Sequence, residues 1–94
     1  MHNDTVETEY DSVKAESNLA KHGVSFEEAA SVLFDPDGLA LEDVYSEGEG
    51  RWLLLGMSDK LRLLVVVYSL PFEDRIRLIS ARPATKAEAK NYAR

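Results

Sequence analysis

Residues 61–70 have the sequence LRLLVVVYSL, and this stretch decides the fold. It is rich in β-branched and aromatic residues, which favour strands over helices. From Leu61 to Tyr68 nearly every position is apolar, a pattern typical of a central strand that is buried on both faces. The sequence therefore predicts a sheet with this strand in its interior.

Three more strands are predicted around the central one, in GLALEDV, RWLLLGMS and RIRLISAR, at residues 38–44, 51–58 and 75–82. The links between the four strands are short. Connections of this length favour antiparallel neighbours over the long crossovers that parallel strands need. We therefore expect a four-stranded antiparallel meander.

Helices are expected before and after this sheet. Asp11 can cap a helix that runs to about Lys21, and Gly23 can end it in the left-handed conformation. The segment SFEE, at residues 25–28, has the S-x-x-E pattern of a capping box and opens a second helix, which DPDG at 35–38 ends. A similar pattern in TKAE, at residues 85–88, opens a short C-terminal helix, TKAEAKNYAR, at residues 85–94.

The expected fold class is thus α+β, with two N-terminal helices, a four-stranded antiparallel meander and a C-terminal helix. Residues 1–94 form one domain, since this length and 45% hydrophobic residues suit a single small core. Residues 1–10 have little periodicity and are expected to be a loosely ordered lead-in.

The composition limits which cofactors, membrane contacts and cellular location we expect for this protein. There is no cysteine, and only His2 and His22 could supply an imidazole, so we expect no metal and no other cofactor. No apolar run approaches the roughly 20 residues that span a bilayer, and the first eleven residues are too polar for a signal peptide. These features predict a cytoplasmic protein without a membrane partner.

The charge is unevenly distributed along the chain. The net charge is −6, yet residues 1–50 carry thirteen acids and two lysines (net −11), whereas residues 51–94 carry nine lysines and arginines and four acids (net +5). Such asymmetry suggests a nucleic acid or another anionic partner for the basic half. The alternative is that both signs are spread over a solvated surface in the folded chain.

Several arginines fall on the predicted strands. Period-two geometry places Arg75 and Arg77 on one face of the last strand, and Arg82 on the other face unless a bulge intervenes. Arg51 and Arg62 lie near the starts of the neighbouring strands, so an arginine-bearing sheet face is expected. Arginine offers a permanently charged fork that binds phosphate oxygens and stabilises extra negative charge in a transition state.

Three segments carry a resemblance to a known family: YDSVKAESNLAKHGVSFEEA (10–29), RWLLLGMS with LLVVVYS (51–58 and 63–69), and RIRLISARPATKAEAKNY (75–92). In this order they resemble the BrnT-type toxins of bacterial type II toxin–antitoxin systems, which are similar in fold to the RelE-type ribonucleases. The resemblance implies a RelE-like endoribonuclease that cleaves RNA without a metal and inhibits growth. It also implies a BrnA-like ribbon-helix-helix antitoxin, as a dimer that neutralises two toxins, with DNA contacted only through the antitoxin.

The resemblance implies candidate site residues, each with a plainer explanation. His22, Glu49, Arg51 and Arg77 are the catalytic candidates, and Lys21, Arg82, Lys86 and Tyr92 are the substrate-binding candidates. His22 has a pKa suited to proton transfer, yet a cation at a helix C-terminus also complements the helix dipole. Each arginine is equally explained by a surface ion pair, Glu49 by a solvated loop, and the basic residues of the last helix by its dipole.

Two other functions stay open. A non-catalytic module of the same fold would bind the antitoxin and modulate repression of the operon, and it predicts arginines paired internally with acids. A domain that binds a small acidic metabolite predicts a closed pocket lined by the same arginines. The ribonuclease predicts instead a continuous positive groove.

Overall fold

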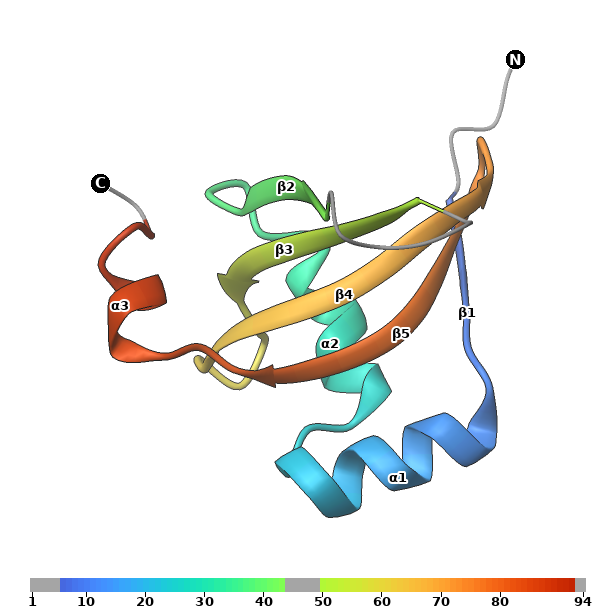
Figure 1. The fold of residues 1–94 in the computed structure, drawn as a ribbon, viewed down its shortest axis with the longest axis horizontal. Coiled ribbons are helices and arrows are strands. Elements are labelled where there is room, and N and C mark those ends of the chain that lie inside the picture. The colour runs from blue at the N-terminus through green and yellow to red at the C-terminus, as the bar shows by residue number, and fades with distance from the viewer. Residues whose placement is uncertain (1–5, 44–49, 93–94) are drawn as a thin grey trace.

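The structure of the chain is a computed structural model that describes residues 6–43 and 50–92. Its elements are, in chain order, β1 (Glu7–Glu9), α1 (Ser12–His22), α2 (Phe26–Val32), β2 (Leu39–Asp43), β3 (Arg51–Met57), β4 (Leu63–Phe72), β5 (Arg75–Pro83) and α3 (Lys86–Ala89). The α+β class and the order of two helices, a sheet and a last helix agree with the sequence expectation (Figure 1).

The sheet differs from the expected four-stranded meander. It has five strands in the order β1-β5-β4-β3-β2, and β1 pairs in parallel with β5, so the sheet is mixed. The prediction of a loose lead-in over residues 1–10 was therefore wrong for Glu7–Glu9. The reason is electrostatic, because Glu7 lies opposite Arg75 and Glu9 opposite Arg77. A three-residue strand held by cross-strand charge pairs has no apolar periodicity to reveal it.

The interior position of the central strand is confirmed. β4 is the middle strand of the sheet and pairs with β3 and β5 along most of its length. Leu64 and Val66 are fully buried, and Val65, which points to the opposite face, is only 4% exposed. The continuous apolar run thus corresponds to a strand whose middle is covered on both faces.

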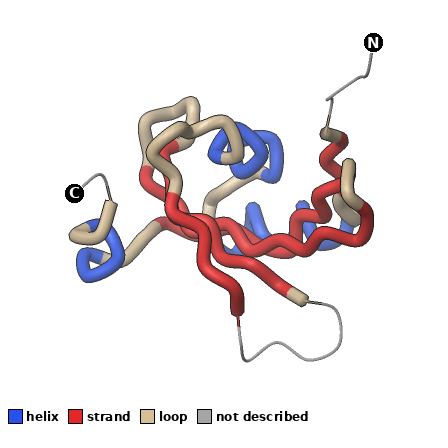
Figure 2. Tube along the Cα trace, turned by 90° about the horizontal axis from the view of Figure 1, so that it is seen from above, coloured by secondary structure: helices blue, strands red, loops and turns tan. Residues whose placement is uncertain are grey.

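The core lies between α2 and one face of the sheet. Phe26, Ala29 and Val32 of α2 are buried against this face, where Leu54, Val66 and Ala81 form one cross-strand row. α1 lies along β5, whereas α3 stands apart from the other two helices at the C-terminal end of β5 (Figures 1 and 2). The opposite sheet face is therefore free of α1 and α2.

The helix ends follow the capping signals with one exception. Asp11 accepts a hydrogen bond from the Val13 N–H, and Gly23 ends α1 at φ 70°. Ser25 caps α2 by accepting from the Glu28 N–H, and Thr85 caps α3. α3 is shorter than the expected TKAEAKNYAR helix, since it ends at residue 89 and continues as turns.

Glu28 has a second role that its capping position did not predict. Its carboxylate is 2% exposed and binds Arg62, while Ser58 donates a hydrogen bond to it at 2.7 Å. Arg62 also donates to the Gly23 carbonyl, so one guanidinium joins the β3–β4 turn to both N-terminal helices. The hydrogen bond from Arg62 lowers the pKa of Glu28. Arg62 is therefore engaged on the helix side of the sheet and is not part of an arginine-bearing face.

Candidate functional site

A β-bulge decides which way the arginines of β5 point. Ser80 pairs with Val67 of β4, but Leu78 pairs with the next residue, Tyr68, so Ile79 is left without a partner. The extra residue turns the side chains after it to the opposite face. Arg82 therefore lies on the same face as Arg77. Strict alternation of side chains along β5 would have placed it on the opposite face.

Arg51 and Arg77 belong to one cross-strand row with Ser69 between them. Ser69 pairs with Arg51 on β3 and with Arg77 on β5, so all three side chains lie on the sheet face away from α2. Arg82 pairs with Val65, four residues along β4 from Ser69, which is about 13 Å in an extended strand. Ser69 is fully buried, and its hydroxyl has no hydrogen-bond partner within residues 6–43 and 50–92. The row thus presents two guanidinium groups on either side of a buried hydroxyl.

Two of these arginines are held by carboxylates of the chain itself. Arg77 Nε donates to Glu9 Oε2 at 2.8 Å, and Arg82 forms a bidentate pair with Glu88, with both N–O distances at 2.8 Å. The Arg82 guanidinium, helped by the Thr85 N–H, lowers the pKa of Glu88 to about 2. Arg51 makes no ion pair with another described residue. Both ion pairs are partly exposed to solvent, and such pairs hold their partners weakly.

A second group of cations lies where α1 runs beside the edge of β5 that β1 leaves uncovered, after Arg77. Lys14, Lys21 and His22 of α1 line a cavity of about 240 Å³, together with Ser17, Asn18 and the bulge residues Ile79 and Ser80. The bulge therefore borders this cavity and also lies between Arg77 and Arg82 in the chain. Bulges are over-represented beside active sites because they redirect side chains in this way.

Asn18 fixes α1 to this edge. Its side chain is buried and donates to the Val24 and Ala81 carbonyls, each at 2.9 Å, while it accepts from the Ala81 N–H at 3.0 Å. Ala81 follows the bulge directly, so one amide sets the position of the α1 C-terminus relative to β5. Lys21 and His22 consequently have a defined place beside Ser80.

The candidates on the C-terminal segment lie elsewhere. Tyr92 donates a hydrogen bond to Asp35 at the end of α2, and this bond raises the pKa of Tyr92 to about 12. Asp35 also accepts from the Met57 N–H, so the tyrosine belongs to a structural junction. Lys86 is exposed at the start of α3.

The structure therefore brings together some of the predicted residues. Arg51, Arg77 and Arg82 share a face, and Lys21 and His22 share a cavity at the adjoining edge. Glu49 lies outside the described residues. Sequence reasoning missed four residues that position or neutralise this site, namely Glu9, Asn18, Ser69 and Glu88. For these four residues, the only signal in the sequence was the capping-box position of Glu88. That position predicts a hydrogen bond to the backbone at the start of α3 and not the ion pair with Arg82.

Three cavities formed by described residues lie between α1 and β5, along β2 and β3, and between α1 and α2, and Arg51, Arg77 and Arg82 line none of these three. The arginine-lined pocket expected for an acidic metabolite is therefore not among them. Within residues 6–43 and 50–92, His, Asp and Glu side chains form no group of three or more that could hold a metal ion. In the same part of the chain, no helix has the length and apolarity needed to cross a membrane.

Comparisons with known proteins give the family and the fold. Residues 10–88 match the family described as "Ribonuclease toxin, BrnT, of type II toxin-antitoxin system". Among solved structures, the chain is similar to the Brucella abortus ribonuclease toxin BrnT with a TM-score of 0.68 and 21% identity, over 87% of this chain and 100% of the other. At this identity the structural match shows a shared fold. No curated protein sequence matches the chain.

Proposed function

Because the chain belongs to the BrnT family of ribonuclease toxins of type II toxin–antitoxin systems, we propose that it is a metal-independent endoribonuclease that inhibits growth in the cytoplasm. Membership of this family implies an RNA target and an antitoxin partner. The proposal extends to the partner's type, a BrnA-like ribbon-helix-helix dimer that neutralises two toxins.

One observation carries the assignment of the site. Arg51 and Arg77 stand in one row on an open sheet face, and Arg82 is turned to the same face by the bulge at Ile79. Lys21 and His22 border that bulge from the other side. This arrangement supports binding of an RNA strand across β5, since guanidinium groups bind phosphate oxygens from fixed directions.

The chemistry then needs two proton transfers and stabilisation of one phosphate. The 2′-hydroxyl of the substrate attacks the adjacent phosphorus, and its proton passes to a general base, for which Glu49 is our candidate. The bond between phosphorus and the 5′-oxygen breaks, and His22 donates a proton to that oxygen. Arg51 and Arg77 stabilise the additional negative charge on the phosphoryl oxygens in the transition state. The products are a 2′,3′-cyclic phosphate and a 5′-hydroxyl.

The internal ion pairs are compatible with this role. Glu9 and Glu88 occupy Arg77 and Arg82 in the free chain. Because exposed ion pairs contribute only about 0–1 kcal/mol, a phosphate of the substrate can replace either carboxylate at little cost. Arg51 has no such competitor among the described residues.

Cleavage of a labelled RNA by the purified chain in EDTA tests the proposal. The wild type should generate fragments with cyclic phosphate ends, and the Arg51→Ala/Arg77→Ala double variant should be slower by about 100-fold or more. Lys60→Ala is the matched control, since Lys60 is an exposed cation in the turn between β3 and β4, near Glu28 and at the other end of β3 from Arg51. Equal activity of a folded double variant would refute the assignment of the arginines.

The role of His22 is tested by His22→Gln in the same assay. A proton donor at this position predicts a large loss of cleavage and a changed pH profile. A lower melting temperature with full activity would instead assign His22 to the helix end, where a cation complements the dipole.

The pairing of Arg77 with Glu9 and of Arg82 with Glu88 also favours a second candidate function. In that case the chain is a non-catalytic module that binds the antitoxin and modulates repression. Intact RNA in the presence of folded wild-type chain, together with tight antitoxin binding, would support this function over the ribonuclease.

A further inference from the structure

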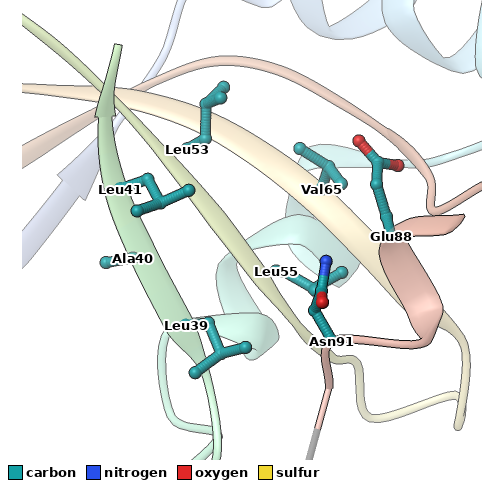
Figure 3. Close-up of a pocket in the computed structure, with 8 residues that line it drawn as sticks. All are labelled: Leu39, Ala40, Leu41, Leu53, Leu55, Val65, Glu88 and Asn91. Carbon is teal, nitrogen blue, oxygen red and sulfur yellow. The ribbon is translucent and has the colours of Figure 1, made fainter.

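An apolar trough lies on the same sheet face as the arginines. It has a volume of about 350 Å³ and is lined by leucines of β2 and β3, by Ala40 and Val65, and by Glu88 and Asn91 at its rim (Figure 3). Leu41 is 68% exposed and Leu39 is 43% exposed, although both are large and apolar. Clustered exposed leucines on a small domain mark an interaction surface.

The trough is continuous with the proposed RNA site. Leu53 and Arg51 are two residues apart on β3 and therefore share a face, about 7 Å apart along the strand. At the other end of the trough, Glu88 is held by Arg82. A ligand that fills the trough consequently contacts Glu88 at one end, and at the other end it lies against Leu53, the neighbour of Arg51 on the same face.

We propose that an amphipathic helix of the antitoxin docks in this trough and thereby covers the face on which Arg51 lies. This inference rests on the proposed function for the partner, since the family implies an antitoxin. The helix inserts apolar side chains among the leucines and presents a carboxylate to Arg51. Neutralisation then results from occlusion of the RNA-binding face.

A helix fits the trough better than an added strand. Leu53, Leu55 and Val65 come from strands with neighbours on both sides, so their backbone groups are already paired. Only side-chain contacts remain available on this face, and a helix satisfies its own backbone hydrogen bonds. A strand added to the outer edge of β2 would leave the trough unfilled.

The charge around the trough agrees with this partner. Arg51 makes no ion pair with a described residue, so it is available to a carboxylate brought by the helix. Leu39 pairs with Leu55, four residues along β3 from Arg51, which is about 13 Å in an extended strand. A carboxylate introduced at Leu39 would therefore be desolvated by the helix out of reach of Arg51, and Leu39→Glu is the informative variant.

The test measures binding of the cognate antitoxin, expressed from the reading frame beside the toxin gene, by calorimetric titration. Leu39→Glu should weaken binding at least about tenfold, while its melting temperature stays close to that of the wild type. Leu39→Ser, a milder change, should weaken binding less. Leu19→Glu is the matched control, because Leu19 is 51% exposed on α1, away from the trough, and it should bind as the wild type does.

The same variants separate this inference from the ribonuclease proposal. Leu39→Glu should still cleave RNA and arrest growth, but co-expressed antitoxin should no longer rescue the cells. If Leu39→Glu and the wild type bind the antitoxin equally well, the docking site is overturned even if RNA cleavage is found. If the wild type leaves RNA intact, the ribonuclease proposal fails while the titration still decides the docking site.

Two further outcomes also overturn the inference. One is that the wild-type chain does not bind the antitoxin at all. The other is that the wild-type chain is a dimer by light scattering, that Leu39→Glu is a monomer, and that both bind antitoxin equally. The trough would then be the contact between two copies of the chain.

Discussion

Replacing Asn18 with alanine should destabilise the chain by about 3 kcal/mol. The amide makes three buried hydrogen bonds, two to the Val24 and Ala81 carbonyls and one from the Ala81 N–H. Each hydrogen bond contributes about 1 kcal/mol net to the free energy of unfolding, and leaving the buried partner groups without a hydrogen bond adds to the loss. Alanine recovers about 0.6 kcal/mol of helix propensity. The balance is a large part of the stability of a domain of this size.

Urea unfolding followed by the fluorescence of Trp52, the single tryptophan, measures this change. With a slope of about 1 kcal/mol per M for a small domain, the unfolding midpoint should fall by about 3 M. Ser17→Ala is the matched control, because Ser17 is the exposed neighbour on the same helix and its replacement should slightly raise the midpoint.

A second variant separates the two halves of the amide. Asn18→Asp keeps an acceptor for the Ala81 N–H but cannot donate to either carbonyl when ionised, so burial should raise the pKa of the new carboxyl. The variant should therefore lose stability as the pH rises above the ordinary range of a carboxyl group. A loss below about 1 kcal/mol for Asn18→Ala, or a pH-independent Asn18→Asp, would refute the view that this amide fixes α1 to β5.

Two other predictions concern packing and pH. Gly56→Ala should cost about 1–3 kcal/mol by overpacking, since the new Cβ would lie 2.8 Å from the Val32 side chain; an unchanged urea midpoint would contradict this. Glu88 has a pKa lowered from 4.5 to about 2 by Arg82, so its contribution to stability is present above the ordinary value and is lost as the pH falls from there towards 2. Wild type should thus lose more stability between pH 5 and 2 than Glu88→Gln does, and parallel pH profiles would show that the pair contributes nothing.

Much of the local structure followed from the sequence because its causes are local. The Asp11 and Ser25 caps, the left-handed Gly23 and the capping box at Thr85 depend on residues within four positions of each other. The central strand was evident from its continuous apolar run. Successive side chains point to opposite faces, so a strand buried on both faces needs apolar residues at odd and even positions alike. Antiparallel pairing of β2 to β5 followed from short links.

The errors share a different cause. β1 was missed because a three-residue strand is stabilised by glutamates opposite Arg75 and Arg77, which are more than sixty residues away in the chain. Arg62 was placed on the arginine face, although Glu28 of α2 holds it on the helix side. In both cases an acidic residue within positions 1–50 pairs with an arginine within positions 51–94. The net charge of each half does not indicate which of these ion pairs form.

For the candidate site as well, the sequence indicated some features and only the structure decided the others. The types of residue, arginines on strands and a Lys-His pair at a helix end, were evident from the sequence together with the family resemblance. Their arrangement depended on one unpaired residue, Ile79, which reverses the direction of Arg82. A bulge reflects how two strands fit together, and period-two counting along one strand has no means of detecting it.

The sequence by itself determined the α+β class, the helix ends and the interior strand, since these result from propensity, capping and apolar periodicity. Only the tertiary structure decided that Arg51, Arg77 and Arg82 share one face, that Glu9 and Glu88 occupy two of them, and that an apolar trough adjoins the row. These features arise where distant segments meet, and their energies depend on distances that exist only after the chain has folded.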